Sequence, residues 1–152
     1  MTRDVARNKK ARRDYHISET YEAGIQLRGT EVKSIREGKV NISDAFVRIE
    51  KLEAFLYGCD IQPWQTAAEF FQHAPRRPRK LLLHKSEILK LAQATDQKGY
   101  TLPCLRMYFK GARVKVEFGL GKGKTHSDQR HDLKKRVEMR EAEREMARFN
   151  RR

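Results

Sequence analysis

Residues 113–120 read Arg113-Val114-Lys115-Val116-Glu117-Phe118-Gly119-Leu120, and this stretch decides the fold class. Its apolar side chains (Val114, Val116, Phe118, Leu120) alternate with Lys115 and Glu117, which places them on one face of an extended chain. Strict alternation of this kind is typical of a β-strand that covers a core with one face and meets solvent with the other. The stretch therefore predicts a strand in an antiparallel sheet.

The segment before this strand predicts its partner. Residues 101–110 are rich in strand-forming side chains, and Lys110-Gly111-Ala112 supplies a turn between the two strands. Pro103 cannot donate a hydrogen bond to a neighbouring strand, so we expect it at a strand start, an edge or a bulge. The sequence thus predicts a long hairpin at the end of the body.

Working outward, we predict further strands and two helices. Residues 15–27 predict a long strand with a bend at Ala23-Gly24, and residues 45–49 and 54–59 predict a second hairpin. The helices are predicted at 30–37 (Thr30 as N-cap, Gly38 as C-cap) and at 86–97 (capped by Ser86 and stopped by Gly99). Strands and helices do not alternate regularly, which favours a mainly β fold, a small antiparallel barrel with flanking helices.

Positive charge is concentrated at the two ends of the chain. The formal net charge is +14, of which residues 1–13 carry +5, residues 122–152 carry +5 and the 108 residues between them +4. We therefore expect a basic N-terminal arm (1–13), a body (14–121) and a basic C-terminal tail (122–152). The tail has Asp132–Arg136 and Glu145–Arg148 pairs at helical spacing but few apolar residues. We expect it to be helical only when a partner orders it.

Composition excludes several classes of protein. No apolar run is long enough to span a membrane, and the charged N-terminus lacks the apolar stretch of a secretory signal. Cys59 and Cys104 are isolated from each other, so two reduced thiols are expected. These features predict a cytoplasmic protein with no membrane partner. Its charge favours a nucleic acid as the ligand.

Motifs for catalysis and for cofactors are incomplete. Gly121-Lys-Gly123-Lys124-Thr125 resembles the end of a phosphate-binding loop, but Phe118 stands where that loop requires glycine. His126 and His131 have no cysteine or further well-spaced ligand beside them, so we predict no metal site. No serine lies in a nucleophile-elbow sequence. We predict a protein without enzymatic activity and without a cofactor.

Basic clusters and aromatic residues fit an RNA-binding protein better. Arg76-Arg77-Pro78-Arg79-Lys80 is a third concentration of positive charge, suited to phosphate contacts that do not read sequence. Seven aromatic residues offer rings for stacking on bases or for filling the core, and for those in strands we favour the core: Tyr15, Tyr21, Phe46, Tyr57, Trp64, Tyr100 and Tyr108.

Several segments, in order, resemble the SsrA-binding protein (small protein B) family. They include Asn8-Lys9-Lys10-Ala11-Arg12, Glu22-Ala23-Gly24-Ile25, Gly29-Thr30-Glu31-Val32-Lys33-Ser34, Gly38-Lys39 with Asn41, and Arg79-Lys80-Leu81-Leu82-Leu83-His84. The resemblance covers nearly the whole chain from Asn8 to about Arg136. It implies an OB-like antiparallel β-barrel with flanking helices and a basic, conditionally helical C-terminal tail.

The resemblance also implies function, partners and sites. It implies a monomer that binds the tRNA-like domain of transfer-messenger RNA and carries it to stalled ribosomes, with elongation factor Tu associated through the RNA. The RNA-binding residues implied or predicted are Asn8, Lys10, Arg12, Glu22, Lys33, Asn41, Arg79, Lys80, Leu82 and His84. The tail is expected to bind small-subunit ribosomal RNA in the vacant messenger channel through Gly123, Lys124, His126, Asp128, Arg130, Lys134 and Arg136.

The tail departs from the family pattern at two points, one of which is Gln129 in place of the usual lysine. An aromatic residue or histidine usually precedes the aspartate, whereas Ser127 precedes Asp128 here and His126 lies one place earlier. A general single-strand-binding or ribosomal OB protein is the alternative function. Such a protein would need neither the ordered motif around Glu22 nor a helix-capable tail.

Overall fold

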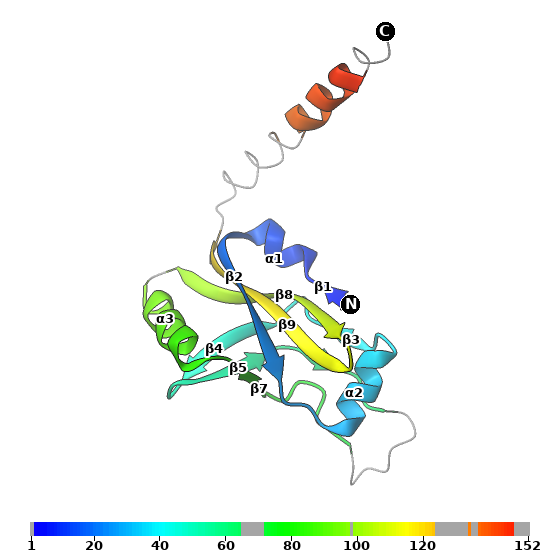
Figure 1. Ribbon diagram of the computed structural model, residues 1–152, viewed down its shortest axis with the longest axis vertical. Helices are drawn as coiled ribbons and strands as arrows, with labels where there is room; N and C mark the ends of the chain where they lie inside the picture. Colours follow the sequence, from blue (N-terminus) through cyan, green and yellow to red (C-terminus); the bar gives the residue numbers. More distant parts are fainter. Residues whose placement is uncertain (1, 65–71, 98, 124–133, 135–136, 148–152) are drawn as a thin grey trace.

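A computed structural model describes residues 2–64, 72–97, 99–123, 134 and 137–147. The chain forms a strongly curved sheet with short helices at its margins (Figure 1). In chain order the elements are β1 (Thr2–Arg7), α1 (Lys9–Asp14), β2 (Tyr15–Ile25), α2 (Gly29–Arg36), β3 (Val40–Asn41), β4 (Phe46–Glu50), β5 (Glu53–Tyr57), β6 (Asp60–Ile61), β7 (Arg79–Leu82), α3 (Lys85–Thr95), β8 (Tyr100–Lys110) and β9 (Arg113–Gly123).

The predicted hairpin of β8 and β9 is present. On its other side β9 pairs with β2, from Tyr15↔Gly123 to Gly24↔Lys115. Val114, Val116 and Phe118 are buried, whereas Lys115 and Glu117 on the opposite face are only partly covered. Gly111 in the connecting turn has φ 62°, a left-handed conformation that glycine adopts without steric cost. The alternation of the sequence therefore predicted both the strand and its buried face.

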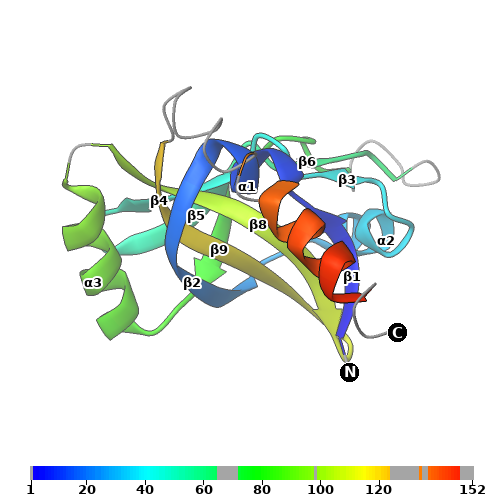
Figure 2. The ribbon, with the colours of Figure 1, turned by 90° about the horizontal axis from the view of Figure 1, so that it is seen from above.

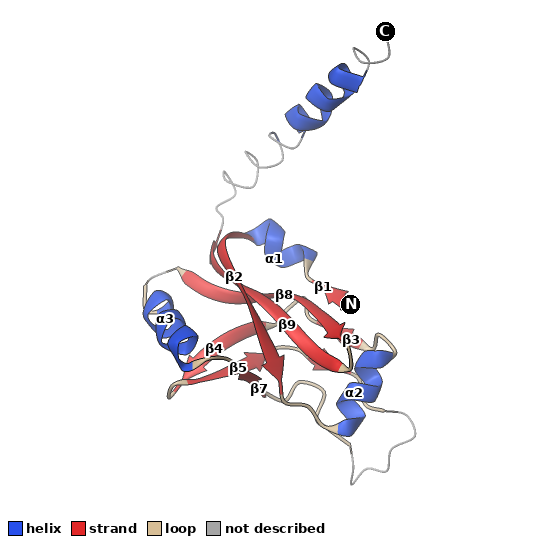
Figure 3. Ribbon diagram, viewed as in Figure 1, coloured by secondary structure: helices blue, strands red, loops and turns tan. Residues whose placement is uncertain are grey.

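The strand pairings of the main sheet lead from β8 through β4, β5, β7 and β2 to β9, and β1 is a further partner of β8. The order is β1-β8-β4-β5-β7-β2-β9, and β9 also pairs with β8, with every pairing antiparallel (Figure 3). One face of the curved sheet encloses the core, which includes Leu56, Leu81, Leu102, Met107, Val116 and Phe118. The prediction of a mainly β protein with a few helices is confirmed. A second, two-stranded sheet joins β3 to β6.

The N-terminal residues belong to the folded body. β1 pairs with β8 from Thr2↔Lys110 to Arg7↔Arg106, and α1 follows it directly along the same edge (Figure 2). At the other end β9 continues to Gly123, which pairs with Tyr15. The predicted boundaries at 13/14 and 121/122 therefore both fall within structured parts of the chain, because backbone hydrogen bonding to β8 and β2 extends beyond the apolar alternation.

Both predicted helices form, with starts one residue earlier than expected. The N-cap of α2 is Arg28, whose backbone N–H donates to the Glu31 carboxylate at 2.8 Å, and Gly38 follows the helix with φ 74°. The N-cap of α3 is His84, whose N–H donates to Glu87 at 3.3 Å. In both helices a glutamate three residues into the first turn satisfies an otherwise unpaired N–H and moves the start away from the predicted Thr30 and Ser86.

The tail is described only in part. Residues 137–147 are helical, and every one of their side chains is exposed, including Met139 and Met146. Of the predicted tail residues, Gly123 ends β9 and Lys134 is an exposed helical residue. Lys124, His126, Asp128, Arg130 and Arg136 lie outside the described residues. Over the part of the chain that is described, no helix is both long and apolar enough to cross a membrane.

A first prediction concerns the turn after β5. Gly58 has φ 71°, and a Cβ there would press on the backbone carbonyl oxygen of Asp44 and lie 3.0 Å from its carbonyl carbon. Gly58→Ala should lower the free energy of unfolding by about 2–5 kcal/mol, because left-handed strain and overpacking add. Gly111→Ala is the matched control, since Gly111 has φ 62° with open space around it. Urea denaturation of both variants measures the difference, and equal losses would contradict the crowding at Gly58.

Candidate nucleic-acid interface

One cavity brings together predicted residues from separate segments. It measures about 660 Å³ and lies where β2, β7, β9 and the start of α3 meet. Glu22, Leu82 and His84 line it, together with Lys80 and Lys115. The register explains this, because Gly24 on β2 pairs with Leu82 on β7 and Glu22 lies two residues before Gly24 on β2. The sequence placed these residues 60 positions apart, and the sheet makes them neighbours.

Glu22 is held by two residues of β8. Its carboxylate accepts a hydrogen bond from the Tyr108 hydroxyl and lies 3.4 Å from the Lys110 ammonium. The hydrogen bond from Tyr108 and the nearby Lys110 and Lys115 lower the pKa of Glu22, against a smaller opposing effect of burial. Glu22 is therefore an oriented anion within a basic surface, able to accept hydrogen bonds from amino or ribose hydroxyl groups.

Tyr108, Lys110 and Lys115 were not predicted as site residues. Tyr108 is 1% exposed and belongs mainly to the core, but its hydroxyl reaches Glu22, and burial raises its pKa. Lys110 and Lys115 extend from the two strands of the terminal hairpin. The position of Lys115 opposite the apolar face was visible in the alternation of residues 113–120, whereas Lys110 lies in the preceding strand. That they flank Glu22 depends on strand pairing and was not visible.

The Leu82 side chain forms an exposed apolar floor. It is 52% exposed, so it is not a core residue, unlike Leu81 beside it, which is 2% exposed. A Cβ on Gly24 would lie 3.4 Å from Leu82, which shows how closely the two strands approach here. His84 is exposed at the start of α3. An apolar surface between a carboxylate and an imidazole suits contact with a base or a ribose.

Arg79 is a correction to the predicted RNA-binding set. Its side chain is 0% exposed, and its guanidinium pairs with the equally buried Glu31 and donates to the carbonyl oxygens of Cys59 at 2.8 Å and Pro75 at 3.0 Å. All of its donors are directed into the protein, so it presents none to an RNA phosphate. Sequence reasoning treated the whole basic run as surface, but strand alternation turns Arg79 inward and Lys80 outward.

Asn8 also has a structural role. It is 4% exposed, and its amide donates to the carbonyl oxygens of Ile42 at 2.9 Å and Cys104 at 2.8 Å. Its side-chain oxygen accepts from the Ala11 N–H at 3.0 Å and thereby caps α1. The amide group is fully used, so a direct contact with RNA is not available to it, although it positions α1.

Of the other predicted residues, only Lys80 lines the Glu22 cavity. The remaining predicted cations and Asn41 are exposed and lie apart from it. Lys10 and Arg12 extend from α1. The Lys10 ammonium lies 3.6 Å from the Asp44 carboxylate, and the Arg12 guanidinium lies 3.9 Å from that of Glu117. Lys33 is exposed on α2, and Asn41 accepts hydrogen bonds from the N–H and hydroxyl of Ser43. The described residues hold no group of three or more His, Cys, Asp or Glu side chains that could bind a metal ion.

The net charge of +14, the antiparallel sheet and the Glu22 cavity place this protein in the class of basic, mainly β proteins that bind nucleic acid at their surface. The family model described as SmpB protein matches residues 5–148. The SsrA-binding protein of Microcystis aeruginosa is 51% identical over 95% of this chain and 94% of its own length. That of a Roseiflexus species is 50% identical over 100% and 96%.

A solved structure agrees with these relatives. Its chain, from work described as "tmRNA-SmpB: a journey to the center of the bacterial ribosome", is 43% identical with a TM-score of 0.67 and covers 84% of this chain and 93% of that one. The chain belongs to the SmpB family of SsrA-binding proteins.

Proposed function

We propose that this protein is an RNA-binding adaptor that binds transfer-messenger RNA and delivers it to stalled ribosomes for trans-translation. The convergence of Glu22, Leu82 and His84 in one cavity is the observation that carries the proposal. Family membership and the likeness to a chain solved with the ribosome support it. The adaptor performs no covalent chemistry of its own and acts as a monomer in the cytoplasm.

The proposed assignment of parts follows from the fold. The ring of antiparallel strands serves as an OB-like barrel that presents the Glu22 cavity to the tRNA-like domain of the RNA. The net +4 charge of residues 124–152, of which 137–147 are helical, suits a tail that binds small-subunit ribosomal RNA in the vacant messenger channel as a helix. Elongation factor Tu joins this complex through the RNA. Lys10, Arg12, Lys33 and Lys80 provide phosphate contacts that do not read sequence.

A binding series tests the proposal. We expect the protein to bind transfer-messenger RNA more tightly than ordinary tRNA or an unrelated hairpin at the same salt concentration. The affinity should fall steeply as salt rises, because each neutralised phosphate releases counterions. Filter binding at several salt concentrations measures both properties. Equal affinity for the three RNAs would instead identify a general single-strand RNA-binding protein.

A prediction for the cavity separates binding from folding. Glu22→Ala and His84→Ala should each lower the affinity for transfer-messenger RNA about tenfold, the loss expected when a contact worth about 1–2 kcal/mol is removed. Both side chains are exposed, so the melting temperature of His84→Ala should change little, and that of Glu22→Ala should fall only by the loss of the hydrogen bond from Tyr108. Glu19→Ala is a matched control, since Glu19 is an exposed glutamate on the same strand outside the cavity. Variants that melt early but bind normally would make these residues structural.

A further inference from the structure

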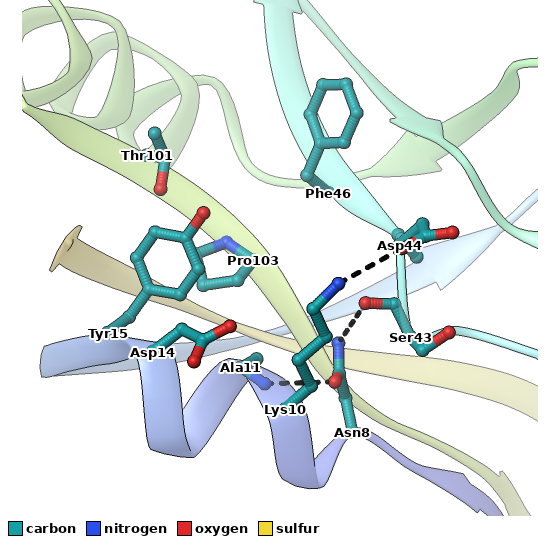
Figure 4. A pocket seen from close by; sticks show the side chains of 11 residues that line it. Asn8, Lys10, Ala11, Asp14, Tyr15, Ser43, Asp44, Phe46, Thr101 and Pro103 are labelled. Atoms are coloured by element: carbon teal, nitrogen blue, oxygen red, sulfur yellow. Dashed lines mark hydrogen bonds and ion pairs between the residues drawn. The ribbon is translucent and has the colours of Figure 1, made fainter. Parts of the chain in front are cut away.

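A second cavity lies at the opposite end of the β4–β5 hairpin from Glu22. It measures about 260 Å³ and is formed between α1, the start of β4 and the first part of β8 (Figure 4). Phe46 opens β4 at this cavity, whereas Leu52 and Glu53, at the far end of the same hairpin, line the Glu22 cavity. No residue lines both cavities. Five-residue strands separate them by roughly 15 Å.

Rings form the walls of this second cavity. Phe46 is 39% exposed, and its ring stacks on that of its cross-strand partner Tyr57 with ring centroids 5.8 Å apart at 17°. The Arg48 guanidinium lies 5.6 Å from the Tyr57 centroid and extends the stack. Figure 4 shows Phe46 on one side of the cavity and Tyr15 and Pro103 on the other. Phe46 is held in place by Tyr57, so a base that stacked on it would not have to immobilise it.

Polar groups at the edge of the cavity have a distinct chemistry. Asp14 and Asp44 contribute carboxylates, which only accept hydrogen bonds. Asp14 accepts from Arg13 Nε at 3.1 Å, and Asp44 lies 3.6 Å from Lys10 and 3.5 Å from Arg76, so each carboxylate has lone pairs left beside the cations it already binds. Carboxylates repel a phosphate inside the cavity but accept from an amino group. Lys10, at the rim, can neutralise the phosphate attached to whatever ligand enters. The lining therefore favours a planar ligand with N–H donors and a negatively charged backbone.

We propose that this cavity binds one unstacked nucleobase that carries an exocyclic amino group, presented by a single-stranded RNA segment. Phe46 stacks on the base, a carboxylate accepts from its amino group, and Lys10 contacts the adjoining phosphate. Phe46 also borders the neighbouring surface around Tyr100, over whose ring the Lys122 ammonium lies at 5.8 Å. The Tyr100 ring and the Lys122 ammonium thus offer the next nucleotide of the RNA a second ring and a second cation. The site is a second RNA contact, separate from the one at Glu22.

A pentanucleotide with one base tests this site. Four positions are abasic, and the central one carries cytosine, uracil or no base, so the phosphate charge is constant. We expect cytosine to increase the affinity by about tenfold or more over the fully abasic chain, with uracil weaker than cytosine. Phe46→Ala should abolish this discrimination, and Phe46→Trp should retain it. Leu89→Ala is the matched control, because Leu89 is a 43% exposed apolar residue that lines neither cavity.

Further variants guard against loss of folding and against confusion with the Glu22 cavity. Tyr15→Leu keeps apolar bulk and should also weaken cytosine binding, and melting curves should verify that each variant is folded. Glu22→Ala should leave the discrimination unchanged, so this site and the proposed binding of transfer-messenger RNA can fail separately. Equal binding of the cytosine and abasic oligomers, or discrimination that survives Phe46→Ala, would overturn the site. Equal binding of cytosine and uracil would overturn the role of the carboxylates.

Discussion

Replacing Arg79 by methionine should lower the free energy of unfolding by about 3–5 kcal/mol, the range for breaking a buried ion pair by removing one partner. The substitution keeps an unbranched side chain of similar length, so the effect comes from lost charge and hydrogen bonds. Glu31 is 0% exposed and would keep only the half-buried Arg77 as a cationic partner. The carbonyl oxygen of Cys59 would lose its Arg79 donor as well, while that of Pro75 would keep the hydrogen bond from the Ile61 N–H at 3.0 Å.

Denaturation in urea measures this loss, and Arg76→Ala is the matched control. Arg76 belongs to the same basic run, but its side chain is 58% exposed and pairs only with surface carboxylates, so its loss should cost less than about 1 kcal/mol. An Arg79→Met variant that unfolds at the parental urea concentration but binds RNA weakly would reverse the assignment. It would return Arg79 to the RNA-binding surface.

The same ion pair makes stability depend on pH at the acid end. Burial alone raises the pKa of Glu31, but hydrogen bonds from Arg77, from the Arg28 N–H and from Arg79 outweigh it and leave this pKa below its usual 4.5. A carboxyl whose pKa is lowered by folding contributes stability that is present above its unfolded pKa. This stability is lost as pH falls through the folded pKa. Glu31→Gln should therefore flatten the decline of stability below pH 4.5.

Truncation after Gly123 should abolish rescue of stalled ribosomes while leaving the body folded. β9 ends at Gly123, and the described residues of the tail are all exposed, so the cut removes no buried side chain among them. The melting temperature should be unchanged. Affinity for transfer-messenger RNA should fall modestly, because residues 124–152 carry ten basic and six acidic side chains and assist any polyanion by their net +4. Tagging of a stalled peptide in a reconstituted translation system measures the loss of function.

A tail of scrambled order separates charge from sequence. It keeps the composition of residues 124–152, and with it the net +4, but moves Lys134, Arg136 and their neighbours out of position. We expect this variant to recover the affinity for transfer-messenger RNA but not the tagging activity. Tagging at the parental rate by the truncated protein, or its recovery with the scrambled tail, would contradict a specific role of the tail in the messenger channel.

The sequence alone was sufficient for the elements whose signal is local. Alternation at residues 113–120 predicted β9 and its buried face, and strand-forming side chains before the turn at Gly111 predicted β8. The two predicted helices, α2 and α3, were found to within two residues because apolar spacing and glycine stops are also local, whereas β1 and α1 were not predicted within the basic N-terminal arm. The resemblance to the family implied RNA-binding roles for Glu22, Leu82 and His84, together with Asn8, before any strand pairing was known.

Only the tertiary structure decided which charged and polar residues face inward. Arg79 and Lys80 are adjacent and equally basic, yet strand alternation together with the buried Glu31 turns one into the core and leaves the other at the cavity. Asn8 was predicted to bind RNA, but its amide joins the start of α1 to Ile42, just after β3, and to Cys104 within β8. The partners of Glu22 on β8 and the ring-lined cavity at Phe46 likewise arise from contacts between remote segments. Composition and periodicity reflect the local preference of a segment for helix or strand. The burial of a polar group depends instead on hydrogen-bonding partners that only the whole fold brings to it.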